Sequence, residues 1–130
     1  MIENIEQWMV SRLDTIENLA GQNFPTVSPT GDEEPPFCLY TLVSETSEAD
    51  LSGGDDIRRA KVQLALFDND NDRLNDVARQ VRKALRCEDV EADDLYIYGT
   101  STTLSAKDFD MRLDMHVQPV IADVVYWQKE

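Results

Sequence analysis

The stretch from Arg59 to Phe67 constrains the fold most, because apolar and polar residues alternate along it one by one. The apolar residues are Ala60, Val62, Leu64 and Leu66. The polar residues between them are Arg59, Lys61 and Gln63. A period of two places successive side chains on opposite faces of a strand. The stretch therefore predicts a strand with one buried and one wet face, as antiparallel sheets have.

Further strands are predicted on both sides of this one. Phe37–Glu45 is rich in β-branched and aromatic residues, and it is most simply antiparallel to the alternating strand. Leu95–Tyr98 predicts a short strand, whereas Phe109–Val117 alternates like a long strand with one buried face. The apolar stretch Val120–Trp127 predicts a final strand or an extended tail.

Two amphipathic helices are predicted, one at the N-terminus and one after the alternating strand. The first spans Ile2–Ala20, and Gly21 suits the left-handed residue that ends a helix. Its apolar positions are Ile2, Ile5, Met9, Leu13 (or Val10), Ile16 and Leu19. The second follows the capping run Asp68–Asp72 and extends to about Arg86. Its apolar stripe consists of Leu74, Val77, Ala78, Val81 and Leu85.

Three polar segments are predicted to lack regular structure. Gln22–Pro36 is a proline-rich extended loop, Thr46–Asp56 an exposed hairpin loop and Cys87–Asp94 an acidic connector. The whole chain, residues 1–130, is then one α+β domain. We expect a mainly antiparallel sheet packed against two helices, in the order α-β-β-α-β-β.

The net charge of −14 is unevenly distributed along the chain. Twelve acids and one base precede Arg58, eight bases and four acids span Arg58–Arg86, and ten acids and three bases follow. Segments this acidic do not bind a phosphate backbone, so they serve solubility, repel DNA or meet a basic partner. The basic segment lacks interleaved aromatic residues. It favours an electrostatic subunit contact over a nucleic-acid site, with Arg79 and Arg82 as candidates.

Residues for catalysis or metal binding are few. A Ser-His-Asp or Cys-His device needs a histidine, and the one present, His116, falls on the polar side of a predicted strand. Asp68–Asp72 resembles the start of a calcium loop, but Arg73 and Arg79 replace the required Gly and Glu. We therefore expect no catalytic residue, metal or cofactor, and we expect that the chain is not an enzyme.

Other sequence signals concern the compartment and the cysteines. No window approaches 18 consecutive apolar residues, and the acidic N-terminus lacks the basic region of a secretory signal. We expect no membrane association and a chain that stays in the cytoplasm where it is made. Cys38 and Cys87 belong to no ligand cluster, so they are predicted to be reduced and packed as small hydrophobes.

An ordered series of short motifs resembles the small tail-completion (tail-terminator) proteins of long-tailed bacteriophages and prophages, over nearly the whole chain. After the N-terminal helix the series comprises Asn23–Pro25, Pro29–Gly31, Pro35–Phe37, Tyr40, Ser44–Thr46, Leu51–Asp55, Arg59–Phe67, Val81–Leu85 and Phe109–Val117. The strong acidity and the apolar segment Val124–Trp127 depart from that pattern and leave the subfamily open.

The resemblance implies a structural protein of the virion tail or neck that is assembled in the bacterial cytoplasm. Such proteins form a ring, usually a hexamer, that caps the tail tube, stops its polymerisation and docks onto the head–tail connector. Genomic DNA passes through the bore without specific binding, and no cofactor is implied. We expect the Thr46–Asp56 loop to reach a neighbouring ring or the connector. Its candidate contact residues are Glu48, Asp50, Leu51, Gly53, Gly54 and Asp55.

Three other functions are compatible with the sequence. A neck or head–tail adaptor would belong to the same virion but stay with filled heads. An acidic DNA mimic that inhibits a basic host protein would need its carboxylates arrayed on one face. A small metal-dependent enzyme comes last. Asp110 and Asp114 share a predicted strand face, but they alternate there with Arg112 and His116, as is ordinary for a solvated face.

Overall fold

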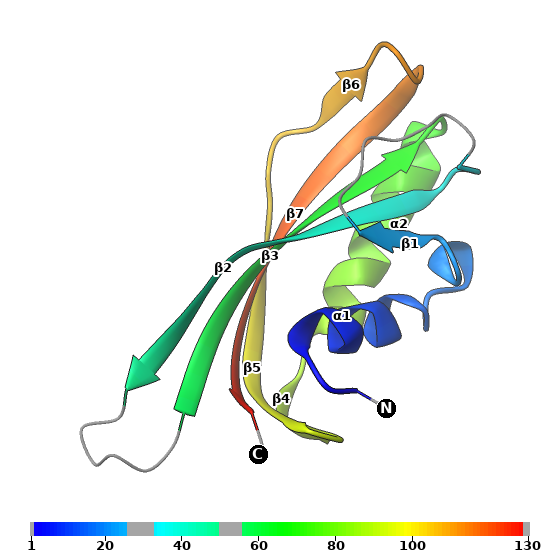
Figure 1. Cartoon of the computed structure of the whole chain (residues 1–130). Coiled ribbons are helices and arrows are strands. Elements are labelled where there is room, and N and C mark those ends of the chain that lie inside the picture. The colour runs from blue at the N-terminus through cyan, green and yellow to red at the C-terminus, as the bar shows by residue number, and fades with distance from the viewer. Residues whose placement is uncertain (1, 26–32, 50–55, 129–130) are drawn as a thin grey trace.

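A computed structural model describes residues 2–25, 33–49 and 56–128, and within them two helices cover one face of a seven-stranded sheet (Figure 1). The elements in chain order are α1 (Ile5–Leu13), the 3₁₀ helix η1 (Glu17–Leu19), β1 (Asn23–Pro25), β2 (Phe37–Ala49), β3 (Asp56–Asp68), α2 (Asn71–Leu85), β4 (Glu88–Ala92), β5 (Leu95–Leu104), β6 (Asp108–Asp110) and β7 (Met115–Gln128). This confirms the predicted α+β class.

The sheet has the strand order β1-β2-β3-β7-β5-β4, and β6 pairs with β7 beyond the end of β5. Its pairings are antiparallel except that of β1 with β2, so the predicted antiparallel character is confirmed. The alternating segment forms β3 at the centre, paired with β7 from Ile57↔Trp127 to Asp68↔His116. The segment Val120–Trp127, predicted as a final strand or a tail, is therefore part of the central strand β7.

The core lies between the sheet and the helices. The four apolar residues of β3 that alternate with polar ones are at most 1% exposed, whereas Arg59, Lys61 and Gln63 are exposed on the opposite face. The predicted stripe of α2 is buried in full. α1 adds Trp8, 2% exposed, which the predicted stripe did not include. Cys38 and Cys87 are free, and burial raises the pKa of both thiols above the ordinary value.

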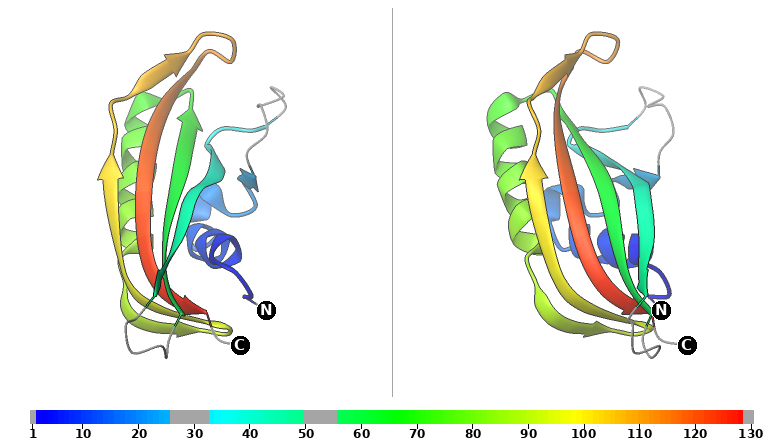
Figure 2. Two further views of the ribbon diagram at one scale, coloured as in Figure 1. Left: turned by 60° about the vertical axis from the view of Figure 1, so that its left-hand side comes forward. Right: turned by 90° about the vertical axis from the view of Figure 1, so that its left-hand side faces the viewer.

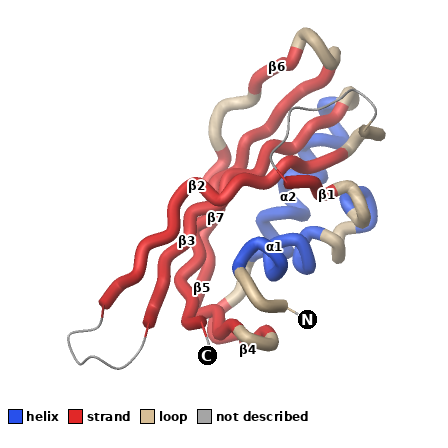
Figure 3. Tube along the Cα trace, viewed as in Figure 1, coloured by secondary structure: helices blue, strands red, loops and turns tan. Residues whose placement is uncertain are grey.

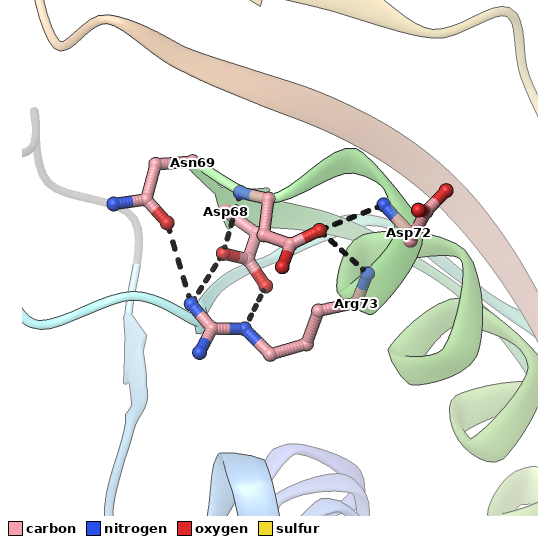
Figure 4. A network of polar contacts seen from close by, with 5 residues as sticks. Asp68, Asn69, Asp72 and Arg73 are labelled. Atoms are coloured by element: carbon pink, nitrogen blue, oxygen red, sulfur yellow. Dashed lines mark hydrogen bonds and ion pairs between the residues drawn. The ribbon is translucent and has the colours of Figure 1, made fainter.

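A carboxylate network fixes the start of α2. The Asp70 side chain accepts hydrogen bonds from the backbone N–H groups of Asp72 and Arg73, so it caps the helix as the sequence predicts. Asp68 is fully buried and receives two bonds from the Arg73 guanidinium, at 2.7 Å from Nε and 2.6 Å from a terminal nitrogen (Figure 4). This bidentate pair joins the end of β3 to the first turn of α2.

The predicted N-terminal helix is too long, because α1 ends at Leu13. The Asp14 carboxylate accepts hydrogen bonds from the Gly21 backbone and the Asn23 side chain, which turns the chain back after one short 3₁₀ turn. Ile16 and Leu19 are nevertheless buried, so helical spacing continues into a segment that is not α-helical. Gly21 has φ +75°, the left-handed conformation predicted for it.

The prediction of one strand over Phe109–Val117 is wrong. The chain instead forms β6, a turn at residues 111–114 and the start of β7. Asp110 accepts hydrogen bonds from the backbone N–H groups of Arg112 and Leu113, and Asp114 adopts φ 57°. Side-chain capture of this kind is typical of a turn, and it outweighs the alternating pattern here.

Three segments predicted as irregular contain strands. Asn23–Pro25 forms β1, Glu88–Ala92 forms β4, and β2 extends through Ala49 while β3 begins at Asp56. β5 also runs to Leu104, well beyond the short strand predicted. These strands exist because a neighbouring strand supplies their hydrogen bonds, which local composition does not reveal.

Candidate subunit interface

The sheet has two open edges, where no other strand of the described residues lies alongside (Figure 3). On one side β1 covers β2 only to the row of Tyr40, so the open edge of β2 includes Leu42–Glu45. On the other side β4 covers β5 to Gly99 and the Cys87 N–H donates to the Thr100 hydroxyl, so the open edge of β5 is Ser101–Leu104. Exposed strand edges offer unpaired backbone groups to a further strand.

A basic notch lies beside the open edge of β5, formed by Arg82 and Arg86 of α2 with Thr100, Ser101 and Thr102. Figure 2 shows α2 running along this side of the sheet. Arg82 Nε donates to the Thr102 hydroxyl at 3.3 Å, and the Thr100 hydroxyl donates to the Leu85 carbonyl. These bonds hold the strand edge against the end of the helix and keep one guanidinium at the notch.

The two arginines predicted as a pair serve different contacts. Arg79 bonds Asp76 at 2.7 Å within α2, and both side chains are mostly exposed, at 76% and 57%. Surface pairs of this kind contribute little, about 0–1 kcal/mol. Arg82, one helical turn further on, is the arginine that reaches the sheet edge. Arg82 therefore lies at the sheet edge, whereas Arg79 bonds within its own helix.

The predicted contact loop is only partly described. Glu48 lies in β2 opposite Ile57, so Thr46–Ala49 is strand and not loop. Five predicted contact residues lie outside the described residues: Asp50, Leu51, Gly53, Gly54 and Asp55. The two strands that lead to them form the long β2–β3 arm seen at the lower left of Figure 1.

The sheet face opposite the helices is polar in its middle rows and has little net charge. Its charged side chains there are Arg59, Lys61 and Asp123, with hydroxyl groups from Ser44 and Ser101 on the Lys61 row. Gly99, which lacks a side chain, leaves a depression of about 290 Å³ between Arg59 and Asp123. At one end of this face Phe37 and Phe67 stack with ring centroids 4.8 Å apart.

The acidic excess lies elsewhere. Exposed carboxylates of β4 and the turns beside it are Glu88, Asp89, Glu91 and Asp93. A second exposed set, Asp108 and Asp114, flanks the β6–β7 hairpin, and a third, Glu3, Asp14 and Glu17, surrounds α1. Further exposed carboxylates lie before and on β2 and at the start of α2, namely Glu34, Glu45, Asp70, Asp72 and Asp76. The described carboxylates are thus dispersed over several elements.

The sequence did not predict an apolar patch on the β6–β7 hairpin, which projects beyond the helices (Figure 1). Met111 at its turn is 87% exposed and Phe109 is 42% exposed. The Phe109 ring meets His116 edge-on at 5.1 Å, so the one histidine of the chain packs against an aromatic ring. The alternating sequence pattern assigned Phe109 and Met111 to the buried face of a strand, so their exposure was not predicted.

Two negative findings apply to residues 2–25, 33–49 and 56–128. These residues contain no group of three His, Cys, Asp or Glu side chains placed to hold a metal ion. No helix among them has the length and apolar character needed to cross a membrane.

Comparison with known proteins reveals a likeness of fold. No family model and no curated protein sequence matches the chain. A chain in a solved structure of the virion of a native gene transfer agent (GTA) particle superposes with a TM-score of 0.66 at 10% sequence identity. The match covers 92% of this chain and 84% of that chain. The two chains share a fold over nearly their whole lengths.

Proposed function

We propose that this chain is a structural protein of a tailed, phage-like particle. The observation that carries the proposal is the shared fold with a chain of a gene transfer agent virion, which extends over 92% of this chain. The motif series that resembles tail-completion proteins supports it independently. Because fold alone does not define function, the role within the particle needs its own argument.

Within such a particle the proposed role is that of tail terminator. The chain would form a ring, taken to be a hexamer, on the end of the tail tube. It would stop tube growth and dock the head–tail connector. Two open edges on opposite sides of one sheet support a ring, because unlike surfaces that meet head to tail close into one when the rotation fits. The ring is then the part of the virion through which the genome passes.

The polar sheet face suits the inner wall of that ring. Helices cover the other face, and Arg59, Lys61 and Asp123 leave this one nearly neutral. A wall with few positive charges lets DNA slide, because each Lys or Arg side chain that contacts a phosphate adds salt-dependent affinity. The acidic segments of the sequence do not supply the middle rows of this face, where Asp123 is the carboxylate beside Arg59 and Lys61. In the proposed ring the acidic sets at β4 and the hairpin would be available to other proteins of the particle.

Removal of the gene from a strain that produces the particles separates this role from that of an adaptor. Without a terminator we expect tails of irregular, excessive length and filled heads that remain unattached, because nothing stops tube polymerisation. Electron microscopy of the lysate measures both. Tails of normal length beside unattached heads would contradict the terminator role and indicate a neck adaptor. Normal, complete particles would contradict both roles.

A further inference from the structure

The two open edges lie at opposite ends of the same rows of residues across the sheet. One row joins Leu42 of β2, through Val62 and Ala122, to Thr102 of β5. Three residues further along β2, another row joins Glu45 to Thr100, which directly precedes the open edge of β5. A second copy placed beside the first therefore presents the open edge of β2 to the open edge of β5.

The strand directions make such a junction antiparallel. β2 is antiparallel to β3, β3 to β7 and β7 to β5, so β2 and β5 of one chain run in opposite directions. Copies related by rotation about an axis along the strands keep this relation where they meet. Antiparallel strands are then able to pair through their backbones and continue one sheet from copy to copy.

On the helix side of the sheet, the two edges that meet at this junction carry opposite charges. Glu45 lies opposite Ala60, which faces the helices, and directly opposed residues of paired strands share a face. The basic notch lies on that side too, because Arg82 belongs to α2 and bonds Thr102. Within its own chain Glu45 has a weak ion pair, with Arg58 at 4.0 Å. A stronger pairing is therefore open to it.

The notch has room for a carboxylate group. Its volume is about 170 Å³, whereas one water occupies about 30 Å³ of liquid, so a carboxylate and a few waters fill it. Two guanidinium groups and three hydroxyl-bearing residues line it. Planar guanidinium groups bind carboxylates through paired N–H donors.

We infer that β2 of one copy adds to the open edge of β5 of the next copy, and that Glu45 enters the notch formed by Arg82 and Arg86. This inference rests on the proposed ring, and it names the contact that closes the ring. The contact also selects the correct partner edge. Two β2 edges would bring Glu45 against Glu45, and two β5 edges would bring the arginines together, so both two-fold arrangements are repelled.

A charge reversal with a matched control tests this contact in the full-length chain. Arg82→Glu is expected to raise the concentration needed for half-assembly about tenfold or more, as reversal of a close interfacial ion pair does. Arg79→Glu makes the same change one turn away on the same helix, outside the notch, and is expected to leave assembly unchanged. Native mass spectrometry over a concentration series measures the ring, and circular dichroism checks that each variant folds.

The double variant Glu45→Arg with Arg82→Glu restores opposite charges and is expected to recover most of the lost assembly. If Arg82→Glu assembles like the unmodified chain, or if the double variant assembles no better than Arg82→Glu alone, the Glu45 contact is wrong while the ring stands. If the unmodified chain forms no ring, the proposed function fails and this contact fails with it.

Discussion

Replacing Trp8 with alanine is expected to lower the free energy of unfolding by about 3–5 kcal/mol, the usual loss when a buried Trp becomes Ala. Trp8 is 2% exposed and is among the largest fully buried side chains of the core. The lost contacts would leave a cavity between α1 and the rest of the core. Since a domain is stable by about 5–15 kcal/mol in total, this loss is a large share of the free energy of unfolding.

Trp127→Ala is the matched control for this substitution. The second tryptophan lies at the end of β7 on the open sheet face and is only half-buried, so its truncation should cost much less. Urea unfolding followed by circular dichroism measures the midpoint and slope for both variants. Equal losses for Trp8 and Trp127 would contradict the packing of α1 on the sheet.

Removing the buried carboxylate of Asp68 has the second large expected effect. Asp68→Ala deletes both bonds to Arg73 and the bond from the Asp70 backbone N–H, and it leaves a guanidinium at a half-buried position. Breaking a buried ion pair costs about 3–5 kcal/mol. The Arg73 side chain is 39% exposed and keeps some hydration, so about 2–4 kcal/mol is expected here.

The double variant Asp68→Ala with Arg73→Ala tests whether the two side chains stabilise the fold as a pair. The double variant should lose less stability than the sum of the losses of the two single variants, because it leaves no unmatched charge. Asp76→Ala, which breaks an exposed pair on the same helix, serves as the control and should change stability by less than about 1 kcal/mol. Additive losses in urea unfolding would show that the Asp68–Arg73 pair is not coupled.

The sequence pattern correctly predicted those elements whose own residues alternate between a buried and an exposed face. β3 alternates because one of its faces meets the helices, and α2 has both its cap at Asp70 and its full stripe in the sequence. Where a side chain competes for backbone hydrogen bonds, the same patterns misled. Asp14 ended α1 early and Asp110 turned the chain after β6, although apolar periodicity continued through both places.

The candidate site was less predictable, because it is made by pairing between distant segments. The excess of bases in α2 pointed to Arg82, but nothing local separated it from Arg79. That separation comes from the reach of Arg82 to Thr102 on β5. Glu45 was assigned to a strand without a role, since its significance depends on β1 ending at the row of Tyr40 and leaving an edge open. Strand neighbours, not composition, decide where the edges are.

The most direct test of the ring is the particle mass of the purified chain, measured by native mass spectrometry and combined with negative-stain imaging. The account predicts a six-fold ring with a central opening and a mass six times that of the 14.8 kDa chain. A chain that remains a compact monomer up to millimolar concentration would contradict it.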